Sequence, residues 1–206
     1  MTILRIEQLT YGVEKLDECI EFLEHWGLEK LNSGASGAEF RTLENQIITL
    51  RLIQDPDLPP TYEDGATLRE VIWGVDSQTT LDEIEVELSK DRKVSKDANG
   101  ALHSYDDRNN YLGFKIAEII EVNLTKESLN FVDDIERVNE RGWPEDRISP
   151  IRIGHLVYSI EAKDNWAAAQ FYIDRLKFRV SDRTTDGGTF LRADGSNYHH
   201  NLFLFL

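Results

Sequence analysis

Three histidines in the last quarter of the chain are the side chains whose types and spacing could do chemistry. His155 lies in an apolar, β-branched stretch, and His199 and His200 form a pair after a turn. Imidazole exchanges protons near neutral pH and is the commonest protein ligand of metal ions. If the pair belongs to a strand, alternation sends its two rings to opposite faces, so only one can reach a common site. The ordinary alternatives are a strand histidine hydrogen-bonded within the core and two solvated histidines on a loop.

The elements expected around these histidines are one strand, one helix and three further strands. The first strand covers residues 151–160 and holds His155, and the last three cover residues 177–181, 189–192 and 201–206. Turns rich in Asp and Gly separate the last three strands. After the first strand, apolar side chains at helical spacing predict a helix. These are Trp166, Ala169, Phe171, Tyr172 and Leu176.

The same order of elements recurs near the N-terminus. Residues 5–13 match residues 152–160 at a constant offset of 147 (152 − 5), and a helix at residues 15–26 and three strands follow. Residues 1–53 therefore form a first βαβββ unit. Internal repetition of this kind indicates a modular architecture.

A second unit is expected over residues 66–117, after a connector at residues 55–62 that holds three of the five prolines. The turn Asp-Asp-Arg-Asn-Asn at residues 106–110 leads into its last strand. Apolar residues three and four apart form the buried stripe of its helix. They are Leu81, Ile84 and Leu88.

Residues 118–150 break the repeat and are interpreted as a helical linker. Their apolar residues fit one or two helical turns, with Thr125 and Ser128 as caps. Gly142, Trp143 and Pro144 would end the helix. The apolar residues are Leu124, Leu129, Phe131, Val132, Ile135 and Val138.

Residues 151–206 carry three motifs in a specific order. They are I-G-H-L-V-Y, then A-x-x-F-Y-x-D-x-L-x-F-R-V-S-D, then F-L-R-A-D-G-S-N-Y-H-H-N-L. This order resembles the third module of type I extradiol ring-cleavage dioxygenases. These enzymes belong to the vicinal oxygen chelate superfamily, together with glyoxalase I and bleomycin-resistance proteins. The resemblance implies an α+β fold of repeated βαβββ modules, and the rest of the chain resembles the superfamily only in its pattern.

The resemblance implies roles for two of the three histidines. His155 stands at the position of an iron(II) ligand, and Mn(II) could replace iron without a change of ligands. His200, the second histidine of the pair, stands where the family has an acid–base residue beside the substrate and dioxygen. The implied reaction is cleavage of a catechol-type aromatic ring by Fe(II) and dioxygen, with the metal held by two histidines and one carboxylate.

The first two units have weaker candidates at the equivalent positions. Gln8 and Glu70 stand three residues before an aromatic residue of their strand, as the metal-ligand position of the last unit does. Only Glu70 is a strong ligand type, and Gly113 fills the strand position where the superfamily often has a carboxylate. We therefore expect the two units to form a paired, metal-free barrel with a structural role, unless Glu70 serves some other use. His25 and His103 have no motif around them and are expected at the surface.

The resemblance also implies a fourth module, which would supply the second histidine and the carboxylate. The strand at residues 201–206, Asn-Leu-Phe-Leu-Phe-Leu, offers no carboxylate. His155 alone cannot hold catalytic iron, so the 206 residues by themselves are expected to be inactive. Their last, apolar strand should be covered either by further protein or by a second copy, which predicts a homo-oligomer through the exposed third unit.

Composition restricts the partners and the compartment. The net charge of −15 argues against a nucleic-acid or anionic membrane partner. Cys19 is the only cysteine, so no internal disulfide can form. The first residues do not resemble a signal peptide, and no apolar run approaches the roughly 20 residues of a membrane span, so we expect a cytoplasmic protein.

The sequence thus predicts an extradiol dioxygenase in three parts: residues 1–117 as an N-terminal domain, 118–150 as a linker and 151–206 as half of a metal domain. One rival is a bleomycin-resistance type protein that binds a small aromatic molecule without metal. Another is a different metal-dependent enzyme of the superfamily, such as a glyoxalase-like lyase or isomerase, against which the His199–His200 pair argues mildly. A structural protein that uses its last strand only for assembly is the third.

Overall fold

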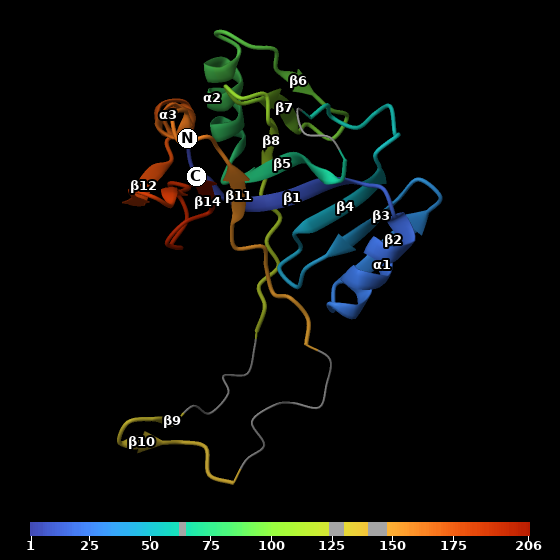
Figure 1. Ribbon diagram of the computed structural model, residues 1–206, viewed down its shortest axis with the longest axis vertical. Coiled ribbons are helices and arrows are strands. Elements are labelled where there is room, and N and C mark those ends of the chain that lie inside the picture. Colours follow the sequence, from blue (N-terminus) through green and yellow to red (C-terminus); the bar gives the residue numbers. More distant parts are fainter. Residues whose placement is uncertain (62–64, 124–129, 140–147) are drawn as a thin grey trace.

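The computed structural model describes residues 1–61, 65–123, 130–139 and 148–206, and it contains the three expected βαβββ units (Figure 1). The first comprises β1 (Ile3–Val13), α1 (Leu16–His25), β2 (Glu29–Gly34), β3 (Gly37–Arg41) and β4 (Ile47–Leu52). The second comprises β5 (Thr67–Val75), α2 (Gln78–Leu88), β6 (Ser95–Lys96), β7 (Leu102–Tyr105) and β8 (Tyr111–Ile116). The third comprises β11 (Leu156–Ser159), α3 (Asn165–Gln170), the π-helical turn η1 (Phe171–Arg175), β12 (Arg179–Thr184), β13 (Gly188–Arg192) and β14 (Leu202–Phe205).

The first two units share one eight-stranded sheet, in the order β2-β3-β4-β1-β5-β8-β7-β6. Within each unit the first and last strands pair in parallel, and β1 pairs with β5 antiparallel to join the units. The sheet has two edges, β2 and β6, so the expected barrel is open. Successive side chains of a strand point to opposite faces of the sheet. One face of this sheet is packed by α1 and α2, and the other face is not covered by either helix.

Local sequence explains where α2 begins and which face it buries. Ser77 precedes the helix in an extended conformation, and its hydroxyl accepts a hydrogen bond from the Thr80 backbone N–H at 3.3 Å. The three apolar residues of the expected stripe are all buried: Leu81, Ile84 and Leu88. No helix within the described residues is long and apolar enough to cross a membrane.

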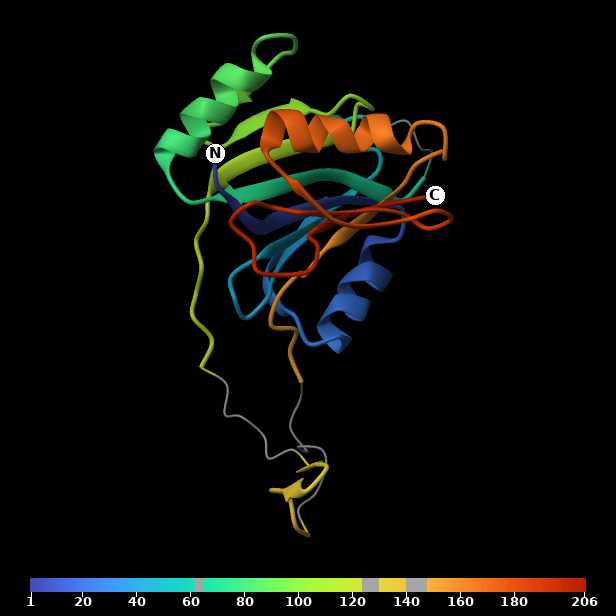
Figure 2. The same ribbon diagram turned by 90° about the vertical axis from the view of Figure 1, so that its left-hand side faces the viewer.

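The third unit packs on the side of the large sheet that α2 covers, and Figure 2 shows α3 (orange) lying over the strands of that sheet. One hydrophobic core includes residues of β1, β5 and α2 together with residues of the third unit. Trp73 of β5 and Phe178 of the third unit meet edge-to-face, with ring centroids 5.1 Å apart. Fully burying such a side chain stabilises the fold by about 1.5–3 kcal/mol, so this packing joins the units firmly.

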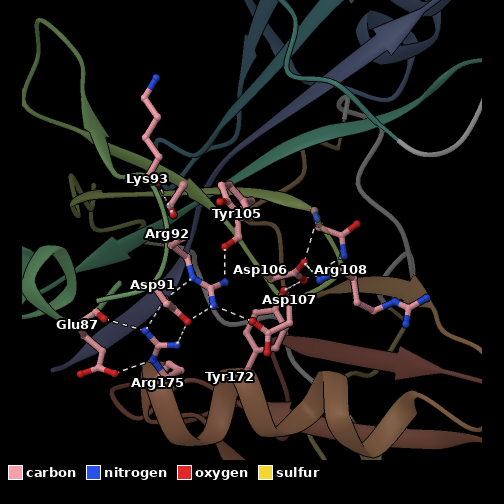
Figure 3. A network of polar contacts seen from close by, with 12 residues as sticks. Glu87, Asp91, Arg92, Lys93, Tyr105, Asp106, Asp107, Arg108, Tyr172 and Arg175 are labelled. Carbon is pink, nitrogen blue, oxygen red and sulfur yellow. Dashed lines mark hydrogen bonds and ion pairs between the residues drawn. The ribbon is translucent and has the colours of Figure 1, made fainter. Parts of the chain in front are cut away.

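A network of polar contacts also joins the third unit to the second (Figure 3). Arg175 of η1 donates to Glu87 at the end of α2 and to Asp91 just beyond it, at 2.6 to 3.0 Å. The buried hydroxyl of Tyr172 donates to Asp106 Oδ2 at 2.8 Å. Arg175, and then Arg92, hold the pKa of Asp91 well below its usual range. The third unit is therefore docked by charge-assisted hydrogen bonds as well as by its core.

The expected turn at residues 106–110 provides the acceptor in that network. Asp106 Oδ1 accepts the backbone N–H groups of Arg108 and Asn110 at 2.8 and 2.9 Å. Asn109 adopts a φ of +63°, a left-handed conformation that asparagine tolerates better than most residues. With Oδ1 used inside the turn, Asp106 presents Oδ2 to the third unit.

The strands of the third unit form a four-stranded sheet in the order β11-β14-β13-β12. Asn165 ties α3 to this sheet, because its side chain donates to the Leu204 carbonyl at 2.8 Å and accepts from the Thr189 hydroxyl at 2.7 Å. The predicted helix is present as α3 continued by η1. The first strand is shorter than expected, since β11 begins only at Leu156.

The expected helical linker is wrong where its residues are described. Instead of a helix, β9 (Asn130–Phe131) and β10 (Asp134–Ile135) form a short antiparallel pair. Asp133 turns the chain with a φ of +63°, and Asn130 exchanges hydrogen bonds with the backbone of Arg137. The apolar residues here are exposed, so no buried face rewards helix formation. The proposed caps Thr125 and Ser128, and Gly142 to Pro144, lie outside the described residues.

Candidate functional site

The predicted metal ligand and the predicted acid–base residue lie side by side. His155 immediately precedes β11, and its ring centroid lies 4.5 Å from that of His200, which precedes β14. Because β11 and β14 are parallel neighbours, the segments that lead into them enter from the same end of the sheet. His155 is exposed, so it is not the hydrogen-bonded core histidine that was the ordinary alternative.

His199 also lies beside His200, although strand alternation was expected to send the two rings to opposite faces. Its Nδ1 lies 3.0 Å from Nδ1 of His200. The expectation relied on strand alternation, but β14 begins at Leu202, and the pair sits in the irregular segment before it. We call His155, His199 and His200 the histidine cluster.

An aromatic wall flanks the histidine cluster. Phe190 of β13 and Phe203 of β14 are cross-strand partners, and their rings stack at 4.0 Å with an interplanar angle of 4°. The Phe190 ring centroid lies 5.0 Å from that of His200 and 5.6 Å from that of His199. An apolar aromatic surface therefore adjoins the imidazoles.

The surroundings of His200 favour its neutral form. Partial burial lowers the pKa of His200 from its ordinary value, and the neighbouring His155 and His199 lower it further. A neutral imidazole at pH 7 can accept a proton. Its Nδ1 faces His199, so Nε2 is the nitrogen available to another molecule.

The described residues do not complete a metal site. Catalytic Fe(II) of the implied kind needs two histidines and one carboxylate on one face. No group of three or more His, Cys, Asp or Glu side chains in the described ranges could hold a metal ion. The histidine cluster can supply ligands, but the donor set it offers does not fit a complete iron centre by itself.

The equivalent positions of the first two units lie on the free face of the large sheet. Gln8 of β1 and Glu70 of β5 line a cleft of about 640 Å³ that contains residues from β1, β3, β4, β5, β7 and β8. The Gln8 side chain donates to the Thr49 hydroxyl at 3.3 Å, and Glu70 contacts His103 at 2.7 Å. We call this hollow the polar cleft.

His103 is therefore wrongly predicted as a surface residue, whereas His25 is exposed as expected. His103 of β7 stands opposite Gly113 of β8, and a Cβ at Gly113 would lie 3.4 Å from its Nδ1. A Cβ at Gly113 would clash instead with the Leu102 carbonyl oxygen, at 2.7 Å, so the glycine allows the close approach of β7 and β8. That pairing across strands was not visible in the spacing of either residue.

Solved structures share this fold. The chain is similar to the Mn(II)-bound glyoxalase from Novosphingobium aromaticivorans, with a TM-score of 0.71 and 19% identity, over 99% of this chain and 62% of that one. It is similar to the 2,3-dioxygenase LapB from Pseudomonas sp. KL28, with a TM-score of 0.68 and 18% identity, over 100% and 70%. An extradiol ring-cleaving dioxygenase from B. fuscum matches with a TM-score of 0.68 and 15% identity, over 99% and 54%.

These likenesses establish the predicted α+β fold, which the chain shares with a glyoxalase and with extradiol-type dioxygenases. The chain spans between about half and two thirds of the length of the proteins it matches. No known family's sequence model matches it, and no curated protein does.

Proposed function

We propose that this chain carries three modules of an extradiol ring-cleavage dioxygenase, which opens a catechol-type aromatic ring with Fe(II) and dioxygen. Mn(II) is the alternative metal. The observation that carries the proposal is the convergence of His155 and His200, with ring centroids 4.5 Å apart, beside the Phe190–Phe203 wall. Two of the similar solved structures are dioxygenases, which agrees with this reaction class.

Each residue of the site has a distinct role in this proposal. His155 is one metal ligand. The Nε2 atom of His200 accepts a proton from a catechol hydroxyl, and His200 later returns this proton to the product. Phe190 and Phe203 provide an apolar aromatic surface against which the substrate ring packs.

The ligand set is incomplete in the described residues, and we propose that other protein supplies the further histidine and the carboxylate. A fourth module or a second copy would supply these ligands from beside the four-stranded sheet. We therefore propose that the active form is larger than one folded copy of these 206 residues.

The test uses the natively expressed gene product, with bound iron and catechol-dependent oxygen uptake as its two readouts. His155→Ala should lose both iron and oxygen uptake. His200→Asn should keep its iron while kcat falls by about 10²–10⁴, the usual contribution of an acid–base residue.

His25→Ala is the matched control, because His25 is exposed on α1 and should change neither readout. A full complement of iron in His155→Ala would contradict its role as a ligand. Steady iron-dependent turnover by the isolated 206 residues would contradict the need for further ligands.

Metal-free binding of a small aromatic molecule is the second candidate, favoured by the stacked Phe190–Phe203 wall beside an incomplete ligand set. Under this function catechol binds with equal affinity before and after EDTA treatment, and no oxygen is consumed. Loss of binding after EDTA treatment, restored by Fe(II), would exclude it.

A further inference from the structure

The polar cleft lies on the opposite face of the large sheet from the helices. Along β5, Val71, Trp73 and Val75 enter the core that α2 covers, whereas Glu70 and Ile72 line the cleft. At about 640 Å³ its volume falls in the range of sites for small organic molecules. The cleft belongs to the first two units, and the histidine cluster to the third.

The cleft floor has an unused hydrogen-bonding group. Thr10 is only 7% exposed and lines the cleft, yet its hydroxyl has no hydrogen-bond partner within the described part of the chain. The hydroxyl oxygen is accessible from the cleft, where it can hydrogen-bond a ligand or solvent. Gln8 and Thr49, hydrogen-bonded to each other, place an amide and a second hydroxyl on the same surface.

A carboxylate–imidazole–carboxylate chain forms the side of the cleft. His103 Nδ1 lies 2.7 Å from Glu70 Oε1, and its Nε2 lies 3.5 Å from Asp97 Oδ2. Glu70 is 8% exposed, so its charge is poorly solvated by bulk water. The hydrogen bond that His103 donates to Glu70 raises the pKa of His103 despite the opposing effect of burial.

The cleft has an excess of negative charge. Arg51 and His103 are the cationic side chains of the described lining, and Arg51 is already paired with Asp55. Even with His103 protonated, four carboxylates against two cations leave a net charge of −2 (2 − 4). The four carboxylates of the lining are Glu39, Asp57, Glu70 and Asp97.

We propose that the polar cleft binds a small organic cation that carries hydroxyl groups, with an amino sugar as the type of ligand it fits. The ammonium group pairs with the excess carboxylates around Glu70, because opposite charges attract strongly where solvent is partly excluded. The ligand hydroxyls pair with Thr10 and the neighbouring amide. Leu58, Pro59 and Pro60 provide an apolar rim for the ring carbons.

The chemistry of the lining argues against two other ligands. A divalent metal ion needs at least three converging donors, and the described residues contain no such group. An organic anion would enter against a net negative charge. Both remain measurable outcomes of the test.

The test is calorimetric titration of the full chain at pH 6 with glucosamine, which is protonated at that pH, and with glucose as its neutral counterpart. Glucosamine should bind more tightly by about tenfold, since only it makes a charge-assisted hydrogen bond. Glucuronate, the anionic counterpart, should not bind. The imidazole proton signals of His103 should shift with glucosamine, whereas those of His155 should not.

Two variants locate the site by separate interactions. Glu70→Gln should weaken glucosamine binding by about tenfold, and Thr10→Val, which keeps the shape of threonine, by about threefold. Glu21→Gln on the exposed face of α1 is the matched control and should bind as the parent chain does. Thermal unfolding of each variant checks that the sheet is intact, and Thr10→Val keeps every charge if Glu70→Gln does not fold.

Several results would overturn this site. Equal affinity for glucose and glucosamine would remove the requirement for a cation. Lack of saturable binding up to about 50 mM glucosamine would remove the site, because weaker binding has no specificity. Displacement of glucosamine by stoichiometric Mn(II) would make this a metal site instead. None of these results bears on ring cleavage, because His155 and His200 lie on the other sheet.

Discussion

The pKa shifts of individual histidines in this protein depend on the groups around them. His103 and His200 are both partly buried imidazoles, yet their pKa values shift in opposite directions. Glu70 stabilises the protonated form of His103, whereas His200 faces two other imidazoles and an aromatic ring. One is therefore suited to holding a positive charge and the other to accepting a proton.

Glu70→Gln should lower the pKa of His103, measured from its imidazole proton shifts as a function of pH. In the parent chain the folded pKa of His103 lies above the unfolded value of about 6.5. The stabilisation from this pair is therefore fully present below pH 6.5 and is lost as pH rises through the folded pKa.

Urea unfolding at several pH values provides the second measurement for this pair. The difference in unfolding free energy between the parent chain and Glu70→Gln should shrink as the pH increases above 6.5. A difference that grows with pH would show that Glu70 does not act through protonated His103.

At the scale of elements, close approach between strands places strict demands on a few backbone positions. Gly188 begins β13 with a φ of +119°, and a Cβ there would collide with the Leu204 carbonyl of β14. β13 and β14 carry Phe190 and Phe203, so this contact also sets the aromatic wall. Gly34, at the end of β2, has open space around it.

Gly188→Ala should lower the free energy of unfolding by about 2–4 kcal/mol, because it adds backbone strain and a steric clash. Gly34→Ala, the matched control, should change it by less than about 0.5 kcal/mol. Chemical denaturation of both variants measures these values. Equal stability of the two variants would mean that β13 and β14 can separate without cost.

At the scale of the whole molecule, the third unit is held to the second through Arg175. Arg175→Gln removes charged contacts to Glu87 and Asp91 and should destabilise the chain by about 1–3 kcal/mol. Arg41→Gln removes a more exposed pair with Glu29 and should cost at most about 1 kcal/mol. Thermal unfolding compares the two.

Low pH should weaken the contact between the second and third units. The folded pKa of Asp91 lies below its unfolded value of about 3.9, so its stabilisation is present above that pH and is lost as pH falls through the folded pKa. The parent chain should therefore lose stability below about pH 4 more steeply than Arg175→Gln does. Parallel acid profiles for the two chains would contradict this cause.

The outer face of the four-stranded sheet should control association. Val157 of β11 and Phe205 of β14 are 47% and 44% exposed, respectively, and β11 forms an edge of the sheet. Phe205→Glu should shift the chain toward the monomer in sedimentation velocity. Val86→Glu places the same charge on the exposed face of α2 and is the control. An unchanged sedimentation profile for Phe205→Glu would show that this face is not the contact.

The sequence by itself determined the modular architecture. Constant spacing between the repeats, periodicity in α2 and the Asp106–Asn110 turn are local signals, and local backbone geometry follows from them. The adjacency of His155 and His200 also agreed with the ordered motifs of the last unit.

Only the tertiary structure decided which distant residues share a site. His103 meets Glu70 because β8 pairs with both β5 and β7 in the sheet, which brings the two side chains to the same face. His199 lies beside His200 because both residues precede β14, which begins at Leu202, so strand alternation does not apply to them. The expected linker helix did not form because its apolar residues had no core to pack against. These outcomes depend on contacts between strands and units, and spacing along the chain does not encode such contacts.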